Sequence, residues 1–309
     1  MTISFQDRVA IVTGAGGGLG RAYALELARR GAKVVVNDLG ASRDGTGTSD
    51  AAQQVVDEIK AAGGMAMADG SSVTEYDQMQ AMVARAKSEW GSVDILINNA
   101  GILRDKTFAK MEPSDFELVV QVHLMGAANA TKAVWETMRE QAYGRILMTA
   151  SSTGLYGNFG QTNYGAAKLA LAGFTKSLYL EGAKYNIRVN TLAPTAGTRM
   201  TEDLFPPEAF KLFAPENVVP AALFLVSEDA PSNAIVAAGA GVVAAAYVTL
   251  TPGVALPEGE RTPEGVAAAW SQITSREGEI VPNSGAEQGA MALKALQASG
   301  LVTPSGTRG

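Results

Sequence analysis

A tyrosine and a lysine one helical turn apart form a pair that could transfer a proton. Tyr164 and Lys168 stand at positions i and i+4, which lie on one face of a helix. A phenol with a pKa of about 10 is a poor base at neutral pH, but a nearby cation favours the phenolate and lowers that pKa. Ser151 precedes Tyr164 by 13 residues, and its hydroxyl could hold a substrate oxygen during the transfer.

A glycine-rich segment near the N-terminus has the spacing of a phosphate-binding turn. The segment TGAGGGLG, residues 13–20, follows an apolar strand and precedes a helix. In such a turn Gly14 permits the sharp bend, Gly18 lets the backbone approach a diphosphate, and Gly20 lets the helix pack against the strand. Because 34 residues of the chain are glycine, the segment could be only a turn, but its position between strand and helix predicts nucleotide binding.

Polar residues at two other strand ends predict further contacts with a nucleotide. Asp38 ends the second predicted strand, where a carboxylate either accepts hydrogen bonds from the adenosine ribose or only caps the strand. Leu39 rather than an arginine follows it, so no adjacent cation neutralises a 2′-phosphate, which favours NAD over NADP. Asn98 and Asn99 close the fourth strand, where their amides either contact neighbouring strands and the cofactor or form a turn.

Short β-branched segments alternate with helical patterns over residues 5–245. Successive strands are separated by about 30 residues, as in β-α-β units, and they lack the polar alternation of half-exposed strands. We therefore predict a doubly wound α/β fold of the Rossmann type with seven parallel strands. The predicted strands are at residues 9–12, 33–36, 65–68, 94–97, 145–148, 187–189 and 235–236, and the helices at 20–30, 51–62, 75–90, 113–139, 163–184 and 214–225.

The composition of the chain changes after residue 250. Residues 251–309 are rich in Pro, Gly, Glu and Thr and contain two weak helical patterns, at 263–273 and 287–298. This segment is too short and too polar for a second core, so we predict an NAD-binding and catalytic domain over residues 1–250 and a helical extension over 251–309. The uncharged segment 230–257 has the length of a membrane span, but its glycines and prolines favour a buried strand and a loop.

Composition also argues against several classes of function. The 309-residue chain is 47% hydrophobic and 18% charged, with a net charge of −6, which disfavours disorder and a nucleic-acid partner. It has no cysteine and a single histidine, His123, so thiol chemistry and disulfides are excluded and we expect no metal site. No secretory or peroxisomal signal is recognisable, and we expect a cytoplasmic enzyme.

In order and spacing, the glycine segment, NNAG at residues 98–101, Ser151 and the Tyr164–Lys168 pair resemble the short-chain dehydrogenase/reductase family over about residues 5–245. The segments NNAGILRDKTFAKM, YGNFGQTNYGAAKLAL and NTLAPTAGTRMT look like the (3R)-hydroxyacyl-CoA dehydrogenase units of peroxisomal multifunctional enzymes of type 2, also called 17β-hydroxysteroid dehydrogenases type 4. The resemblance implies a stand-alone bacterial relative that forms a homodimer or a higher homo-oligomer.

The resemblance also implies a role for each candidate residue. Tyr164 would be the catalytic acid and base, Lys168 would lower its pKa and bind the nicotinamide ribose, and Ser151 would orient the substrate oxygen. The residues that would hold NAD are Gly14, Gly18, Leu19, Gly20, Asp38, Ser71, Asn98, Lys168, Ala196 and Thr198.

Three positions depart from the family pattern. His123 stands where the family commonly has a catalytic asparagine in its fourth helix, so the imidazole is either a proton relay or a structural group. Ser71 or Ser72 replaces the aspartate that commonly contacts adenine. Thr195 follows Pro194 where a glycine is usual.

From the resemblance we expect reversible NAD-dependent oxidation of a (3R)-3-hydroxyacyl-CoA to its 3-ketoacyl-CoA, in fatty-acid or sterol side-chain β-oxidation. A polyanionic CoA would need basic side chains, and the candidates are Arg104, Lys106, Lys110 and Lys211. A 17β-hydroxysteroid, the first alternative or a second activity, would need only an apolar slot, for which the candidate lid residues are Phe205, Phe210 and Phe213. The sequence also leaves open a biosynthetic 3-ketoacyl reductase and a non-catalytic NAD-sensing protein.

Overall fold

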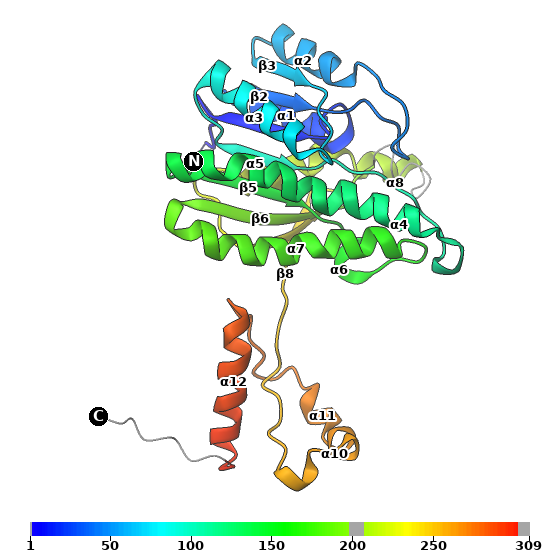
Figure 1. Cartoon of the computed structure of the whole chain (residues 1–309), viewed down its shortest axis with the longest axis vertical. Coiled ribbons are helices and arrows are strands. Elements are labelled where there is room, and N and C mark those ends of the chain that lie inside the picture. The colour runs from blue at the N-terminus through cyan, green and yellow to red at the C-terminus, as the bar shows by residue number, and fades with distance from the viewer. Residues whose placement is uncertain (1, 198–206, 302–309) are drawn as a thin grey trace. The chain divides into compact units, whose positions relative to one another are not determined.

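The structure is a computed structural model that describes residues 2–197 and 207–301. The chain divides into two compact units, residues 1–246 and 247–309, and this boundary lies just before residue 250, where the composition changes. The first unit is a sheet with helices on both faces (Figure 1). The roles assigned to the two units stay predictions.

One sheet of eight strands organises the first unit. The strand order is β3-β2-β1-β4-β5-β6-β7-β8; β1 to β7 are parallel and β8 runs antiparallel to β7. The strands are β1 (Val9–Thr13), β2 (Lys33–Asn37), β3 (Met65–Asp69), β4 (Ile95–Asn98), β5 (Gly144–Thr149), β6 (Ile187–Pro194), β7 (Ile235–Gly239) and β8 (Val242–Ala246).

The sheet has one strand more than the seven predicted, because β8 lies where the sequence predicts a loop. Ala240 and Gly241 have φ values of +50° and +77°, as in the two-residue turns that connect antiparallel strands. The strand itself reads VVAAA and is largely exposed. Alanine is depleted in strands, so neither its residue types nor an apolar alternation indicates β8 in the sequence.

Helices cover both faces of the sheet, because strand residues point alternately to the two sides. Val34 and Val36 of β2 belong to one core, beneath α1 (Gly18–Arg29), α2 (Ala51–Ala61) and α9 (Val219–Phe224). Val35 belongs to the other, beneath α3 (Tyr76–Trp90), α5 (Gly126–Gln141) and α7 (Thr162–Gly182). The remaining helices are η1 (Phe108–Lys110), α4 (Pro113–Val120), α6 (Ser152–Tyr156), η3 (Ala183–Tyr185), α8 (Pro207–Leu212) and η5 (Pro215–Asn217).

The helix predicted at residues 113–139 is continuous but not uniform. Between α4 and α5 lies η2 (Gln121–Met125), a turn of π-helix. Such turns are rare and occur frequently at functional sites. His123 lies in this turn and is buried.

The second unit is built from short helices. They are η6 (Glu258–Glu260), α10 (Pro263–Ala268), α11 (Trp270–Ile273) and α12 (Gly285–Ala298), so the pattern at 263–273 corresponds to α10 and α11. An antiparallel bridge joins Leu250 to Ile280. Nowhere in residues 2–197 and 207–301 does a helix have both the length and the apolar character needed to cross a bilayer.

Candidate active site

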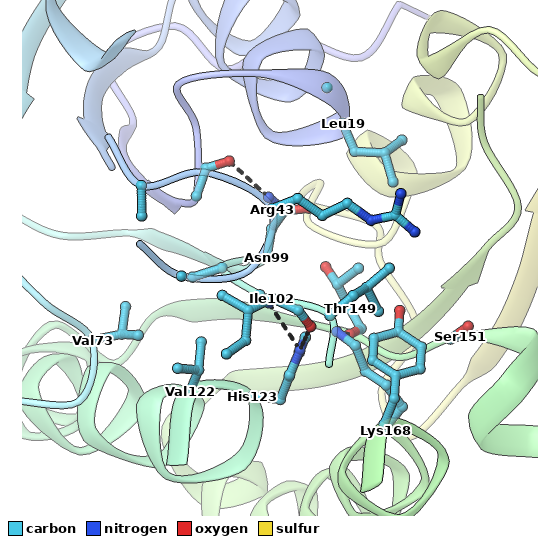
Figure 2. Close-up of a pocket in the computed structure, with 18 of the residues that line it drawn as sticks. Leu19, Arg43, Val73, Asn99, Ile102, Val122, His123, Thr149, Ser151 and Lys168 are labelled. Atoms are coloured by element: carbon cyan, nitrogen blue, oxygen red, sulfur yellow. Dashed lines mark hydrogen bonds between the residues drawn. The ribbon is translucent and has the colours of Figure 1, made fainter. Parts of the chain in front are cut away.

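A cavity of about 490 Å³ opens at the carboxyl ends of the parallel strands. The chain builds the sheet from β1 through β2 to β3 and then resumes on the other side of β1 with β4, and open α/β sheets bind ligands at such a reversal. Figure 2 shows side chains from both halves directed into this space. The predicted site residues that line it are Gly14, Gly18, Leu19, Asp38, Ser71, His123, Ser151, Tyr164, Lys168 and Ala196.

The glycine turn has the backbone geometry that its spacing predicts. Gly14 and Gly18 have φ values of +63° and +52°, a region that side chains disfavour. Gly20 lies beneath the turn rather than on the cavity, and a Cβ there would come within 2.2 Å of the Gly14 carbonyl oxygen. The first turn of α1 therefore presents its unpaired N–H groups to the cavity, as anion-binding helix ends do.

Asp38 joins the glycine turn to the end of β2. Its Oδ2 accepts a hydrogen bond from the Gly16 N–H at 2.8 Å, and its Oδ1 accepts one from the Gly40 N–H at 2.7 Å. The carboxylate thus supports the turn while it still lines the cavity. Each carboxylate oxygen can accept more than one hydrogen bond, so these contacts leave Asp38 able to bind ribose hydroxyls.

The two asparagines after β4 differ in their surroundings. Asn99 lines the cavity, and its amide donates to the backbone oxygens of Thr13 and Gly14 at 3.1 and 3.0 Å. Asn98 does not line it, and its buried amide donates to Thr131 Oγ1 at 3.0 Å. The asparagine that the resemblance assigns to NAD is therefore an internal one, and Asn99 is the one exposed to a ligand.

Ser71, which follows β3, and Asn37, at the end of β2, bring two more polar groups to the cavity. Ser71 lines it, and its backbone N–H donates to the buried Asp69 carboxylate at 2.8 Å. Asn37, to which the sequence pattern assigns no role, donates to the Ser71 carbonyl oxygen at 2.9 Å and also lines the cavity. The place of Asn37 at the end of β2, next to Asp38, could have indicated from the sequence that it lines the cavity. Thr198, also expected to contact NAD, lies outside the described residues.

Ser151, Tyr164 and Lys168 all line the cavity, and Figure 2 shows Ser151 and Lys168 on the same side of it. Ser151 caps α6, and its Oγ accepts a hydrogen bond from the Thr153 N–H at 3.2 Å. Lys168 Nζ lies 5.6 Å from the centre of the Tyr164 ring and donates to the Thr149 carbonyl oxygen at 2.5 Å.

Burial sets the ionisation of the phenol and the amine. It raises the pKa of Tyr164 to about 12, against the opposing hydrogen bond with Ser151. Burial also lowers the pKa of Lys168 to about 7. The expected lowering of the Tyr164 pKa by Lys168 is thus not found here. An ammonium that burial itself disfavours does not offset the cost of desolvating the phenolate.

His123 packs against Tyr164 from the π-helical turn. The two ring centres are 5.2 Å apart and the rings are perpendicular. His123 Nε2 lies 2.8 Å from the Ile102 carbonyl oxygen and 3.1 Å from the Ile102 nitrogen. Burial, with a smaller contribution from the Lys168 charge, lowers the pKa of His123 well below its usual value. The imidazole is therefore neutral, and it has no space for a neighbour larger than Gly101.

None of the four basic residues considered for a CoA patch lines the cavity, and two of them are paired with a carboxylate. Arg104 and Lys106 both pair with Asp115, at 3.0 and 2.9 Å, and neither lines the cavity, nor do Lys110 and Lys211. Arg43, which the sequence pattern does not single out, is a lining residue. Its position five residues after Asp38 is the feature of the sequence that could have indicated a place in the cavity.

Of the three phenylalanines considered for an apolar lid, Phe205 lies outside the described residues. Phe210 and Phe213 lie against Gly197, whose N–H donates to the Phe213 carbonyl oxygen at 2.6 Å. A Cβ on Gly197 would meet the Phe210 ring at 3.0 Å. The Phe210 ring therefore packs against Gly197, whereas the Phe213 ring lies by Gly239, where a Cβ would meet it at 3.3 Å.

The chain is similar to known proteins along most of its length. It is 48% identical to peroxisomal multifunctional enzyme A of Dictyostelium discoideum over 289 residues, which cover 93% of this chain and 64% of that protein. A putative short-chain type dehydrogenase/reductase of Mycobacterium tuberculosis is 49% identical over 88% of this chain and 96% of its own length. The structure of full-length peroxisomal multifunctional enzyme type 2 from Drosophila melanogaster matches with a TM-score of 0.80 and 35% identity, covering 96% of this chain and 50% of that one.

The chain therefore spans less than two thirds of the multifunctional proteins that it resembles. The family model described as short chain dehydrogenase matches residues 8–209, which contain the glycine turn, Asp38, Ser151, Tyr164 and Lys168. Because this match covers more than half of the chain, the protein belongs to the short-chain dehydrogenase/reductase family of NAD(P)-dependent enzymes.

Proposed function

We propose that the protein is an NAD-dependent dehydrogenase that interconverts (3R)-3-hydroxyacyl-CoA and 3-ketoacyl-CoA. The observation that carries the proposal is the convergence of Ser151, Tyr164 and Lys168 on a cavity that also contains the glycine turn. The similarity to peroxisomal multifunctional enzymes supports an acyl-CoA of β-oxidation as substrate. A homodimer and a cytoplasmic location stay predictions.

The residues at the nucleotide end fit a dinucleotide. The open turn at Gly14 and Gly18 and the start of α1 at Leu19 would hold the diphosphate, and Asp38 would bind the adenosine ribose. A bound nicotinamide supplies the hydride acceptor for the oxidation. The carboxylate of Asp38 would repel a 2′-phosphate, which supports NAD over NADP.

Ser151 and Tyr164 act on the oxygen of the reacting carbon. In the oxidation, the hydroxyl proton passes to the phenolate oxygen of Tyr164. The carbinol hydrogen leaves with the C–H bonding electrons as a hydride, which the nicotinamide would accept, and the C=O bond forms. In the reduction, the phenol returns that proton, and Ser151 Oγ hydrogen-bonds the substrate oxygen. Because burial raises the pKa of Tyr164 to about 12, the phenol is protonated at neutral pH. Oxidation should therefore accelerate as the pH rises, and reduction should not.

A panel of substrates tests this proposal. Initial rates with NAD and NADP are measured on (3R)- and (3S)-3-hydroxyacyl-CoAs and on a 17β-hydroxysteroid, with Tyr164→Phe as the catalytically dead control. We expect turnover of the (3R) series with NAD, and NADH binding but no turnover by Tyr164→Phe. Activity on the (3S) series alone would overturn the assignment, and activity on the steroid alone would establish a hydroxysteroid dehydrogenase. Ketoacyl reduction specific for NADPH would indicate a biosynthetic reductase, and NAD binding without turnover would indicate an NAD-sensing protein.

The cofactor preference has its own test at Asp38. Asp38→Asn keeps an acceptor for the glycine turn but removes the charge. We expect the ratio of kcat/KM with NADP to that with NAD to rise about tenfold or more, which corresponds to about 1.4 kcal/mol. Asp57→Asn, on the exposed side of α2, is the matched control. An unchanged ratio in Asp38→Asn would show that this carboxylate does not select the cofactor.

A further inference from the structure

The Arg43 side chain extends toward the side of the cavity that Leu19 and Thr149 line. Figure 2 shows its guanidinium between Leu19, in the first turn of α1, and Thr149, at the end of β5, with Val73 on the far side of the cavity. A diphosphate held at the N-terminus of α1 would lie beside Leu19. We propose that Arg43 binds the diphosphate of the dinucleotide and is a specificity-determining residue for it.

The loop that carries Arg43 is an ordered turn. Asp44 accepts hydrogen bonds from Ser42 Oγ and Thr46 Oγ1, both at 2.7 Å, and from the Thr46 N–H at 3.1 Å. Ser42 and Thr46 are also joined through their backbones at 2.7 Å. Gly45 has a φ of +89°, which closes the turn in a region that favours glycine. Arg43 therefore starts from a fixed backbone, and less conformational entropy is lost when it binds a ligand.

The same turn is attached to the segment that follows β4. The Leu103 N–H donates to the Arg43 carbonyl oxygen at 3.0 Å, and Arg104 Nε donates to the Asp44 carbonyl oxygen at 3.0 Å. Arg104 is itself held by Asp115. Since Ile102 and Leu103 also line the cavity, these bonds set the position of Arg43 relative to the cavity wall.

The charge distribution of the cavity favours a diphosphate as the ligand of Arg43. Among the described residues that line it, the charged ones other than the neutral His123 are Asp38, Arg43 and Lys168. Lys168 is buried against the Thr149 carbonyl oxygen, whereas the Arg43 guanidinium lies on the side of the cavity that carries Leu19, in the first turn of α1 (Figure 2). A helix N-terminus supplies only partial charge, whereas a guanidinium supplies a full charge and two parallel donors for phosphate oxygens.

Binding measurements with fragments of the cofactor test this inference, which rests on NAD(P) binding and not on the acyl substrate. Dissociation constants are measured for NADH, NADPH, ADP-ribose, ADP, adenosine and a 3-hydroxyacyl-CoA with the wild-type chain, Arg43→Met and Arg43→Lys. We expect Arg43→Met to bind NADH, ADP-ribose and ADP about 10- to 100-fold more weakly, as for the loss of a hydrogen bond to a charged group. Adenosine should bind within twofold of wild type, and Arg43→Lys should be intermediate.

Two controls test whether a contact with the diphosphate, and not a change in net charge, weakens binding. Lys60→Met, on the exposed side of α2, changes the net charge equally and should leave every dissociation constant unchanged. The wild-type preference for ADP over adenosine should also weaken as salt is added, and less so in Arg43→Met.

Four outcomes would overturn the inference: unchanged ADP binding in Arg43→Met, a loss confined to NADPH, a loss confined to acyl-CoA, or an equal loss for adenosine. The first outcome would show that Arg43 has no role in binding. The second would assign it to the 2′-phosphate, and the third to the acyl substrate. The fourth would show that it only supports the fold of the loop. If the wild-type chain binds NADH but turns over no hydroxyacyl-CoA, the proposed substrate fails while the assignment of Arg43 is still tested.

Discussion

The two ends of strand β5 each hold a buried cationic side chain, and the two are satisfied very differently. Arg145, at the amino end, is fully buried, and Lys168, bonded to the last residue at the carboxyl end, is 4% exposed. Arg145 donates to four carbonyl oxygens. Lys168 has a single hydrogen bond among the described residues, to Thr149. One end of β5 thus holds a buried charge with four carbonyl partners, and the other end adjoins a buried amine of α7 with one.

At the amino end of β5, the surroundings of Arg145 stabilise its charge. The carbonyl partners of Arg145 are those of Gly144, Asn186, Ser227 and Glu228, at 2.8 to 3.3 Å. The ring of Tyr143 lies 4.1 Å from the Arg145 guanidinium and 3.8 Å from that of Arg8. A buried ion with this many partners fixes structure and has little left with which to bind a ligand.

The carboxyl end leaves polar atoms without partners. Buried side-chain atoms with no hydrogen-bond partner include Asn98 Oδ1, His123 Nδ1 and Thr149 Oγ1. A cavity of about 10 Å³, lined by Asn98, His123 and Lys168, has the size of one water molecule. Unsatisfied groups cost stability, and these three residues line the two cavities at this end of the sheet, as expected where fold stability is exchanged for chemistry.

The largest expected effect comes from removing Lys168, the buried cation with a single hydrogen bond. Lys168→Met should lower kcat/KM by about a thousandfold or more, within the range of acid–base catalysis, because it removes the charge beside Tyr164. It should also stabilise the fold, since a buried ammonium with one partner is replaced by an apolar side chain of similar length. The measurements are initial rates and urea unfolding, and Lys132→Met on the exposed face of α5 is the control.

The stability gain of Lys168→Met should depend on pH with a definite sign. Burial lowers the pKa of Lys168 to about 7, below its value in the unfolded chain, so the folded state binds fewer protons between pH 7 and about 10. The wild-type penalty is therefore full below pH 7 and disappears toward about pH 10. A shift of this size corresponds to roughly 5 kcal/mol at most. A gain that grew with pH would contradict a buried, destabilised ammonium.

Removing Arg145, the buried cation with four carbonyl partners, should have the opposite effect. Arg145→Met leaves the carbonyl oxygens of Gly144, Asn186 and Ser227 without their donor, and we expect a loss of about 3 kcal/mol or more in the free energy of unfolding. The kcat/KM of the folded protein should stay within about twofold. Arg188→Met is the matched control. That arginine is half-exposed and donates to two carbonyl oxygens, so its loss should cost about 1 kcal/mol. Equal losses in the two variants would show that burial of Arg145 adds nothing.

Sequence reasoning succeeded where function depends on residue type and local spacing. The positive φ values of Gly14 and Gly18 follow from a turn that only glycine tolerates well, and Tyr164 and Lys168 share a helix face because of their i, i+4 spacing. The doubly wound architecture follows from apolar strands alternating with helices, and the structure confirms it. The Tyr143–Arg145 arrangement has no local pattern, because its carbonyl partners come from distant segments of the chain.

Sequence reasoning failed where tertiary contacts determine which side chains are buried or paired. The burial of Asn98 and the exposure of Asn99 depend on the neighbouring strands, and Asn98 is paired with a threonine 33 residues away. The pairing of Arg104 with Asp115 depends on how the segment after β4 folds onto α4, and the position of Arg43 depends on bonds between its loop and that segment. The expected effect of Lys168 on Tyr164 did not include the cost of burying both groups, which reverses the direction of the pKa shift.

The smallest expected effect tests whether the histidine beside Lys168 carries a proton. Since His123 is the only histidine, its ring nitrogens give one set of NMR signals, and burial should keep them in the neutral form from pH 8 to below pH 6. The unfolded chain takes up a proton below about pH 6.5 and the folded one does not, so wild-type stability should fall on acidification by up to about 1.4 kcal/mol per pH unit. His123→Phe keeps the perpendicular ring contact but loses both Ile102 contacts, so it should be less stable at pH 8 and should lack this acid dependence. An imidazolium signal at pH 7 would make His123 a proton carrier and would remove the contrast between the two ends of β5.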